Sequence, residues 1–215
     1  MTDKAYVYSA RSSYDDPTVA STYERVRFTS LLGRYRRQRE IRAVRAVLGR
    51  LPDRPLSILD CPCGIGRWWP LLARRASSIT AMDIAPAMME RAALRVPRTR
   101  VPVTLVQGDA ERLPLEDGAV DVTFSFALTK HLPRPVQYQV LREFSRVSRI
   151  AVVCTFGVMN HVTYEFWRRR GFRESYPLFP EELQWMAQAA GLRVAATRPC
   201  TTPIGVEHVV LFEKA

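Results

Sequence analysis

The chain has 215 residues, which is enough for one domain with a sizeable hydrophobic core and no need of disulfides or a structural metal. Its 47% apolar residues are ordinary for a globular protein, and no apolar run approaches the roughly 20 residues of a membrane helix. The formal net charge is +11, and all 32 basic residues are Arg except Lys4, Lys130 and Lys214. Such charge attracts acidic partners, but a GC-rich genome also produces an Arg excess, and the chain has no nucleic-acid-binding motif. Nucleic acid is therefore not the favoured partner.

The N-terminal part of the chain predicts a polar segment followed by a helix. Residues 1–30 are polar and Tyr-rich and lack the apolar stretch of a signal peptide, so we expect a cytoplasmic protein. From Leu31 to Leu51 apolar residues recur at helical spacing, and Gly49 and Pro52 end the pattern. We therefore divide the chain into an N-terminal unit, residues 1–52, and a main domain, residues 53–215.

The main domain alternates short apolar runs with helical patterns. The predicted strands are 56–60, 78–82, 101–107, 120–125, 150–155, 192–197 and 206–212. The predicted helices between them are 68–76, 86–96, 135–147, 161–170 and 180–190. This alternation predicts an α/β fold with a mostly parallel sheet that is covered by helices on both faces. Such sheets bind ligands beyond the carboxyl ends of their strands, where the strand order reverses.

Gly or acidic residues follow each of the first three strands. Gly64 and Gly66, in the turn after the first strand, permit a tight turn and a close approach of the backbone to a ligand. Asp83 ends the second strand about 20 residues later, where a carboxylate can accept two ribose hydroxyls. Gly108 and Asp109 follow the third strand, and an acidic group there can bind the amine of a purine. Gly and Asp end strands in many proteins, but this order along one sheet edge favours a nucleoside ligand.

The four cysteines do not predict a metal site or a disulfide framework. Cys61 and Cys63 form a C-x-C pair without a second pair to complete a zinc site, and Cys154 lies in an apolar strand-like run. We expect no bound metal.

With these motifs in place, the sequence resembles the class I S-adenosylmethionine-dependent methyltransferases of the type 11/25 group. The turn after the first strand, usually L-D-x-G-C-G-x-G, reads LDCPCGIG over residues 59–66. The resemblance is strongest in GDAERLPLEDG over 108–118, and it continues through 120–133. It implies a Rossmann-like, seven-stranded, mostly parallel sheet with helices on both faces and an antiparallel C-terminal hairpin. It also implies S-adenosylmethionine as cofactor, with S-adenosylhomocysteine as product.

The resemblance implies roles for nine residues around the cofactor, and Arg67 is added to them as a further candidate. Asp60 would order the turn from beneath, Asp83 would bind the ribose hydroxyls, and Asp109 would bind the adenine amine. Arg67 is a candidate partner of a carboxylate. The implied cofactor-binding residues are Asp60, Cys63, Gly64, Gly66, Arg67, Asp83, Ile84, Asp109, Ala110 and Phe126. One departure from the family pattern is Pro62, which replaces the usual first Gly, fixes a negative φ and removes a backbone donor.

The acceptor side is less determined by the sequence. His131, just past the fourth strand, is the candidate general base, although it can equally support its loop. Similar methyltransferases cover the cofactor with an N-terminal lid. Residues 1–30, with Tyr14, Tyr23 and Arg27, would form this lid. The alternative is that these residues pack the first helix onto the sheet. The aromatic-rich segment 161–180 would either line the acceptor pocket or pack on the sheet.

The function indicated is transfer of a methyl group to a small-molecule or glycan-type acceptor, with an acidic or phosphorylated molecule as one form of it. An Asn-Pro-Pro-aromatic motif, typical of many enzymes that methylate base or amide nitrogen, is replaced by SFAL at 125–128, which favours oxygen, carbon or carboxylate acceptors. Methylation of RNA or protein, and a non-catalytic cofactor-binding subunit, are the alternatives. A protein partner or a homodimer stays open.

Overall fold

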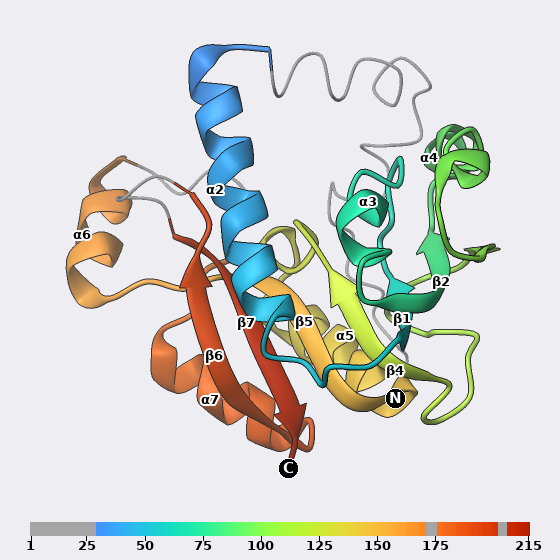
Figure 1. The fold of residues 1–215 in the computed structure, drawn as a ribbon. Helices are drawn as coiled ribbons and strands as arrows, with labels where there is room; N and C mark the ends of the chain where they lie inside the picture. The colour runs from blue at the N-terminus through green and yellow to red at the C-terminus, as the bar shows by residue number, and fades with distance from the viewer. Residues whose placement is uncertain (1–28, 171–175, 202–205) are drawn as a thin grey trace.

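The computed structural model describes residues 29–170, 176–201 and 206–215 (Figure 1). The strands are β1 (Leu56–Asp60), β2 (Ala76–Asp83), β3 (Val103–Gln107), β4 (Val120–Ser125), β5 (Ser148–Gly157), β6 (Leu192–Pro199) and β7 (Glu207–Lys214). The α-helices are α2 (Leu31–Leu48), α3 (Trp69–Leu72), α4 (Pro86–Ala93), α5 (Arg134–Val147), α6 (His161–Arg170) and α7 (Pro180–Ala189). Two short 3₁₀ helices are η2 (Val96–Arg98) and η3 (Thr129–His131).

The seven strands form one sheet in the order β3-β2-β1-β4-β5-β7-β6. Neighbouring strands from β3 to β5 are parallel, whereas β7 runs antiparallel to both β5 and β6. The expected Rossmann-like sheet with an antiparallel C-terminal hairpin is confirmed. Strand order reverses between β1 and β4, so the turns that follow these two strands flank the place where such sheets bind ligands.

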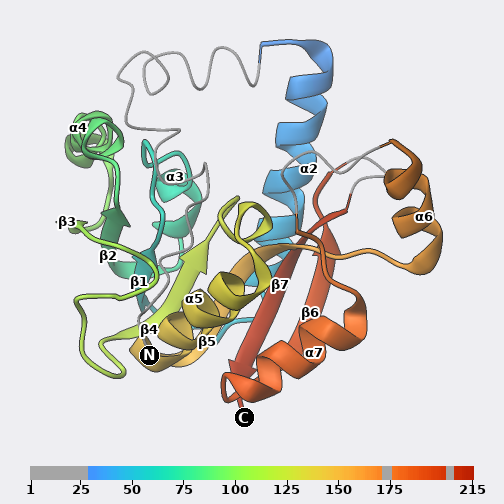
Figure 2. The ribbon, with the colours of Figure 1, turned by 180° about the vertical axis from the view of Figure 1, so that it is seen from behind.

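Two hydrophobic layers cover the sheet because side chains alternate between its faces. Ile58 of β1 and Val153 of β5 point into the layer built with α2, α3 and α4, whereas their neighbours Leu59 and Val152 point into the layer built with α5 and α7. Figure 2 shows α5 and α7 on the face opposite to α2. The central strands are apolar on both sides, as expected of a parallel sheet covered on both faces.

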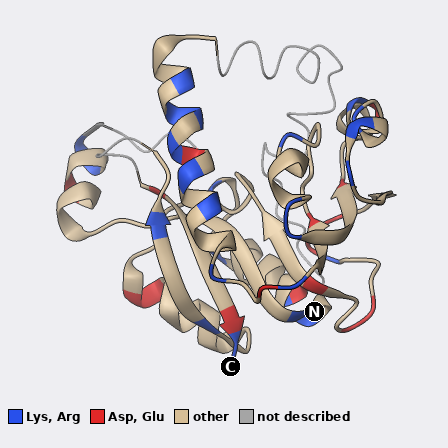
Figure 3. Ribbon diagram, in the orientation of Figure 1, with Lys and Arg blue, Asp and Glu red and all other residues tan. Residues whose placement is uncertain are grey.

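Helix α2 lies against the β6–β7 hairpin, and its N-terminal half extends beyond the carboxyl edge of the sheet (Figure 1). Ser30 caps it by accepting a hydrogen bond from Gly33 N at 3.0 Å. Its buried stripe consists of Gly33, Glu40, Ala43, Val44, Val47 and Leu48. The other face is basic, and Figure 3 shows Arg along the length of the helix. Among the described residues, no helix is long and apolar enough to cross a membrane.

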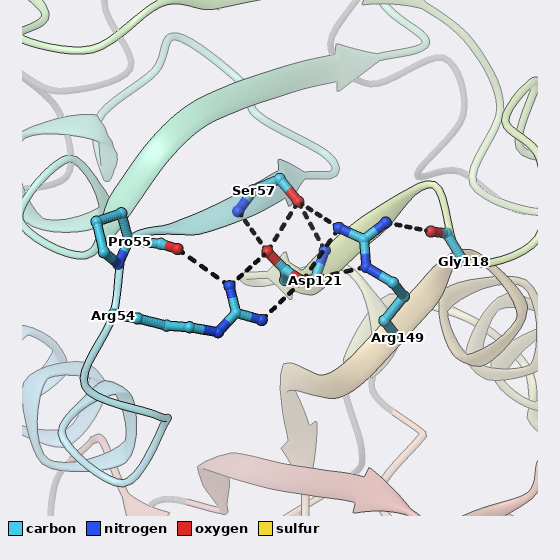
Figure 4. Close-up of polar contacts among 6 residues, drawn as sticks. All are labelled: Arg54, Pro55, Ser57, Gly118, Asp121 and Arg149. Carbon is cyan, nitrogen blue, oxygen red and sulfur yellow. Dashed lines mark hydrogen bonds and ion pairs between the residues drawn. The ribbon is translucent and has the colours of Figure 1, made fainter.

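A cluster of polar residues joins the amino-terminal ends of β1 and β4, at the sheet edge opposite the ligand-binding turns (Figure 4). The Asp121 carboxylate accepts hydrogen bonds from Ser57 N at 2.9 Å, from Arg54 Nη2 at 3.2 Å and from Arg149 Nη2 at 3.0 Å. Burial alone would raise the pKa of Asp121, but these bonds outweigh it and lower the pKa to about 2. The ionised carboxylate therefore stabilises the fold.

We expect Asp121→Asn to lower the free energy of unfolding at pH 7 by about 2 kcal/mol, because two guanidinium groups lose their carboxylate. The pKa of Asp121 is depressed in the folded state, so its contribution is complete above about pH 4 and is lost as the pH falls through about 2. Urea unfolding of both proteins between pH 7 and pH 2 measures this difference. Asp117→Asn is the control, since the Asp117 side chain is 82% exposed in its pair with Arg146. A pH-independent difference, or equal effects of the two substitutions, would contradict this role of Asp121.

Candidate functional site

The turn after β1 is held by hydrogen bonds to the end of β2. Cys63 N donates to Met82 O at 2.8 Å, and Gly64 N donates to Asp83 Oδ2 at 2.8 Å. Gly64 and Gly66 have φ values of +52° and +73°, which L-residues with a side chain rarely adopt. A Cβ on Gly66 would lie 2.8 Å from the Trp69 ring, whereas a Cβ on Gly64 would meet none of the described residues within 4 Å. Gly66 is thus required for packing, whereas no described side chain or backbone crowds Gly64.

Asp83 lies at the centre of this arrangement. Its second carboxylate oxygen, Oδ1, accepts a hydrogen bond from Ala85 N at 3.0 Å, so the side chain links the β1 turn to the β2 turn. A carboxylate has about four acceptor positions, and these two backbone bonds occupy two of them. The next residue, Ile84, is 39% exposed although it is apolar, and it therefore offers a hydrophobic surface beside the carboxylate.

The segment after β3 approaches from the other side of Asp83. Gly108 N donates to Asp83 O at 3.1 Å, and the Asp109 carboxylate accepts from Glu111 N at 2.9 Å, which fixes the turn. A Cβ on Gly108 would lie 2.8 Å from Met82 Sδ, so this close passage requires Gly. Asp109 is half-buried.

The loop after β4 forms the opposite wall. Ala127 has a φ of +65°, an unusual value for a residue other than Gly, and its N donates to Thr155 Oγ1 at 2.7 Å. This conformation directs both neighbours, Phe126 and Leu128, to a common cavity. His131, at the end of η3, also lines that cavity.

Two adjoining cavities lie along these turns. The first has an empty volume of about 820 Å³, which includes space open to solvent. It is lined by Pro62, Cys63, Gly64, Ile65, Arg67, Trp68, Asp83, Ile84, Ala85, Met88, Phe126, Ala127, Leu128 and His131. The second, of about 420 Å³, is lined by Cys61, Pro62, Asp83, Ile84, Gly108, Asp109, Ala110, Glu111, Leu128, Leu132 and Val140. The shared residues Pro62, Asp83, Ile84 and Leu128 join the two into one elongated site.

The structure brings most of the sequence-predicted site residues to these walls. Cys63, Gly64, Arg67, Asp83, Ile84, Phe126 and His131 line the first cavity, and Asp109 and Ala110 line the second. Pro62, the departure from the family pattern, follows a cis peptide bond from Cys61 and lines both cavities. Asp60 and Gly66 lie behind the walls, as support for the turn.

Asp60 is fully buried beneath the turn. Its Oδ2 accepts a hydrogen bond from Trp69 Nε1 at 3.0 Å, so its partner is an indole rather than the backbone of the turn. Its Oδ1 has no hydrogen-bond partner among the described residues. Burial raises the pKa of Asp60 to about 8, more than the Trp69 hydrogen bond lowers it, so the protonated form predominates at neutral pH.

Arg67 is placed by contacts that the sequence reasoning did not foresee. Its guanidinium lies 4.4 Å from the centre of the Trp68 ring and 5.0 Å from that of Phe126, and both Nη atoms donate to Glu40 Oε2 at 3.0 Å. Glu40 was not predicted as a functional residue. The sequence does give one sign of Glu40: it is an acidic residue on the buried face of a helix whose other charged residues are mostly Arg.

The described aromatic residues of segment 161–180 line neither cavity. Tyr164 packs 5.4 Å from Phe179, and Phe166 packs 5.6 Å from Trp167, measured between ring centres. Figure 1 shows α6 on the side of the molecule away from α3 and α4. Phe172 lies outside the described residues, as do residues 1–28 with the proposed lid and its Tyr14, Tyr23 and Arg27.

Two further chemistries are not indicated by the described part of the chain. It contains no group of three or more His, Cys, Asp or Glu that could hold a metal ion. Burial raises the pKa of the Cys61 and Cys63 thiols, which keeps both neutral. His208, in β7, donates a hydrogen bond from Nδ1 to Val206 O at 2.9 Å, and a structural role was expected there.

Comparison with known proteins places this site in a family. A family model described as "Methyltransferase domain" matches residues 58–151. The magnesium protoporphyrin IX methyltransferase of Synechocystis PCC 6803, solved with bound SAH (S-adenosylhomocysteine), superposes with a TM-score of 0.76 at 15% identity, over 96% of this chain and 98% of that one. Residues 58–151 of the chain belong to the methyltransferase-domain family.

Curated relatives of this methyltransferase-family chain include proteins with different acceptors. It is 30% identical over 145 residues, 65% of its length, to a 2-methyl-6-phytyl-1,4-hydroquinone methyltransferase of Oryza sativa subsp. japonica. It is 31% identical over 179 residues, 78% of its length, to a malonyl-[acyl-carrier protein] O-methyltransferase of Laribacter hongkongensis. The chain spans 40% and 55% of the lengths of these two relatives.

We expect Asp83→Asn to weaken the binding of S-adenosylhomocysteine about 10- to 100-fold in calorimetry, a change of about 1.4 to 2.8 kcal/mol. An amide supplies one acceptor oxygen and one NH₂ group, so it cannot accept from Gly64 N and Ala85 N together with ribose hydroxyls. Asp117→Asn, on the exposed surface, is the control and should bind as the wild type does. Unchanged affinity of a folded Asp83→Asn protein would remove Asp83 from the site.

Proposed function

We propose that this chain binds S-adenosylmethionine in the two joined cavities and transfers its methyl group to a small-molecule acceptor. The observation that carries the proposal is the position of Asp83, whose carboxylate lies where the two cavities meet and is fixed by amides of two turns. A ligand that carries a ribose between a base and a polar tail would place its ribose at Asp83, its base in one cavity and its tail in the other.

The proposed binding mode assigns the adenine to the second cavity. Asp109 supplies an acceptor for its amine, Ala110 supplies backbone contacts, and the exposed Ile84 covers its face. The methionine part would then extend into the first cavity along Cys63 and Gly64, where no neighbouring atom occupies the space beside the Gly64 Cα. The two carboxylates, Asp83 and Asp109, and the space beside Gly64 therefore fit the groups of the cofactor.

When bound, S-adenosylmethionine supplies an electrophilic methyl group on a sulfonium, so the protein mainly has to align donor and acceptor and exclude water. Phe126, Met88 and Leu128 give the first cavity an apolar lining, which would exclude water once donor and acceptor fill it. Cys63 faces this cavity, but because burial raises the pKa of its thiol, the group stays neutral and does not compete as a nucleophile.

The acceptor would enter on the side of Phe126 and His131. The first cavity combines apolar walls with one guanidinium, that of Arg67, and one imidazole, that of His131, which suits a compact and partly apolar molecule with an acidic group. The hydroquinone and malonyl-thioester acceptors in the names of the relatives support a small acceptor with oxygen or carbon as the methylated atom. A glycan-type or phosphorylated acceptor is a narrower form of the same proposal.

Calorimetry with S-adenosylhomocysteine, followed by mass spectrometry of small acidic acceptors incubated with S-adenosylmethionine, tests the proposal. We expect micromolar binding and a mass gain of one methyl group on at least one acceptor. Absence of binding would contradict the proposal and favour a non-catalytic subunit. Methylation of RNA or protein in place of the small acceptors, with strong dependence on salt in the case of RNA, would contradict the assigned acceptor class.

His131 is the proposed general base for an acceptor that loses a proton. We expect His131→Gln to lower kcat about 100-fold or more and to abolish the pH dependence of kcat near neutrality, while the affinity for S-adenosylhomocysteine is retained. A steady-state pH profile of both proteins measures this. Near-normal turnover with an unchanged profile would leave His131 only a role in supporting η3.

A further inference from the structure

A chain of five alternating charges extends from the first cavity across α2 to the β6–β7 hairpin. Arg67 donates two hydrogen bonds to Glu40, and Arg36 Nε lies 3.5 Å from the other oxygen of Glu40. Arg36 Nη2 also donates to Glu207 Oε2 at 2.6 Å, and Lys130 Nζ donates to Glu207 Oε1. We call this set the α2 ion chain.

The α2 ion chain is largely buried, which makes its geometry restrictive. The side chains of Glu40, Arg67 and Glu207 are 1%, 10% and 10% exposed. Burial alone would raise the pKa of Glu207, but Lys130 and Arg36 outweigh it and lower the pKa, so this carboxylate stays ionised. A buried charge is tolerated only with partners in good geometry, so each member limits where the next can lie.

Both ends of the α2 ion chain adjoin the first cavity. Arg67 is itself a wall residue and lies against Trp68 and Phe126. Lys130 directly precedes His131, and both belong to η3. The middle of the ion chain, Arg36 and Glu40, belongs to α2, which contributes no residue to either cavity wall.

We propose that Glu40 is a positioning residue of the methyltransferase site: from α2 it fixes the Arg67 guanidinium against Trp68 and Phe126, and through Arg36 and Glu207 it ties this wall to η3. The inference rests on the proposed function, because the cavity it positions is the proposed cofactor and acceptor site. Glu40 touches no ligand in this arrangement and acts through Arg67. The positions of Arg67 and η3 at the cavity then depend on α2, a helix outside the Gly- and Asp-containing turns of the site.

The first test is S-adenosylhomocysteine binding by Glu40→Gln, measured by calorimetry at 25 °C on the full chain. Gln keeps the size of Glu but loses the charge that holds both Nη atoms of Arg67, so we expect about a tenfold weaker affinity. The matched control is Asp121→Asn, which also removes a carboxylate from two guanidinium groups but at the opposite sheet edge. A merely structural role would lower the Tm of both variants and leave both affinities unchanged, and this result would overturn the inference.

Coupling to Arg67 provides the second test. If Glu40 acts through Arg67, the double variant of Glu40→Gln with Arg67→Gln should bind no more weakly than Arg67→Gln alone. Additive losses would overturn the coupling. Should Glu40→Gln not fold, Arg67→Lys replaces it, because Lys keeps the charge but cannot form the two-pronged contact while stacked on the rings. Wild-type affinity of Arg67→Lys would equally contradict positioning.

These results separate the inference from the proposed function. Failure of the wild-type chain to bind S-adenosylhomocysteine contradicts both. Binding by the wild type, loss with Asp83→Asn and no loss with Glu40→Gln contradicts the positioning role alone.

Discussion

The Asp83 carboxylate is the constraint on which the site depends. It accepts one hydrogen bond from Gly64 N in the turn after β1, 19 residues before it, and one from Ala85 N in the turn after β2, so two separate loops are fixed to a single side chain. Ionic hydrogen bonds of this kind are stronger than neutral ones, and Asp83 is only 6% exposed, so the geometry is stiff. Asp83 lines both cavities. The same group thus builds the site and offers the contact that we assign to the ribose.

Parallel strand order explains why such a site forms at all. The carboxyl ends of β1, β2, β3 and β4 are adjacent in the sheet, so four short turns meet at one edge without any need for contacts along the sequence. The opposite edge carries the Asp121 cluster, which holds the amino-terminal ends of β1 and β4 together. One edge is therefore fixed by structural ion pairs, while the other is left open for a ligand.

Most of the correct predictions from the sequence rest on local patterns, namely the spacing of apolar residues and the turn residues at the ends of elements. The predicted strands 56–60 and 120–125 and the helix 161–170 agree residue for residue with β1, β4 and α6, because periodicity and turn residues mark their ends. The predicted helix 68–76 is wrong in length, since only Trp69–Leu72 is α-helical and Ala76 already pairs in the sheet as the start of β2. Strand β5 is longer than predicted and extends to Gly157, where it pairs with Glu207 of β7, a partner 50 residues away.

The site residues that the sequence predicted are those marked by a local pattern, whereas those placed by long-range contacts were missed. Asp83 and Asp109 follow strands and are found from pattern alone. The Glu40–Arg67 pair joins an N-terminal helix to a turn 27 residues later, and the sequence showed only an Arg-rich helix there. The exposure of Ile84 and the left-handed Ala127 likewise follow from tertiary context. The fold is thus encoded locally, whereas the side chains that tune the cavity are set by long-range packing.

A crystal structure of the chain with S-adenosylhomocysteine tests the central claim most directly. The account predicts the ribose hydroxyls on the Asp83 carboxylate, the adenine between Ile84 and Asp109, and the sulfur of the ligand in the cavity bordered by Phe126. A ligand bound elsewhere on the chain, or an Asp83 carboxylate that contacts only Gly64 and Ala85 while the ribose lies on other residues, would contradict it.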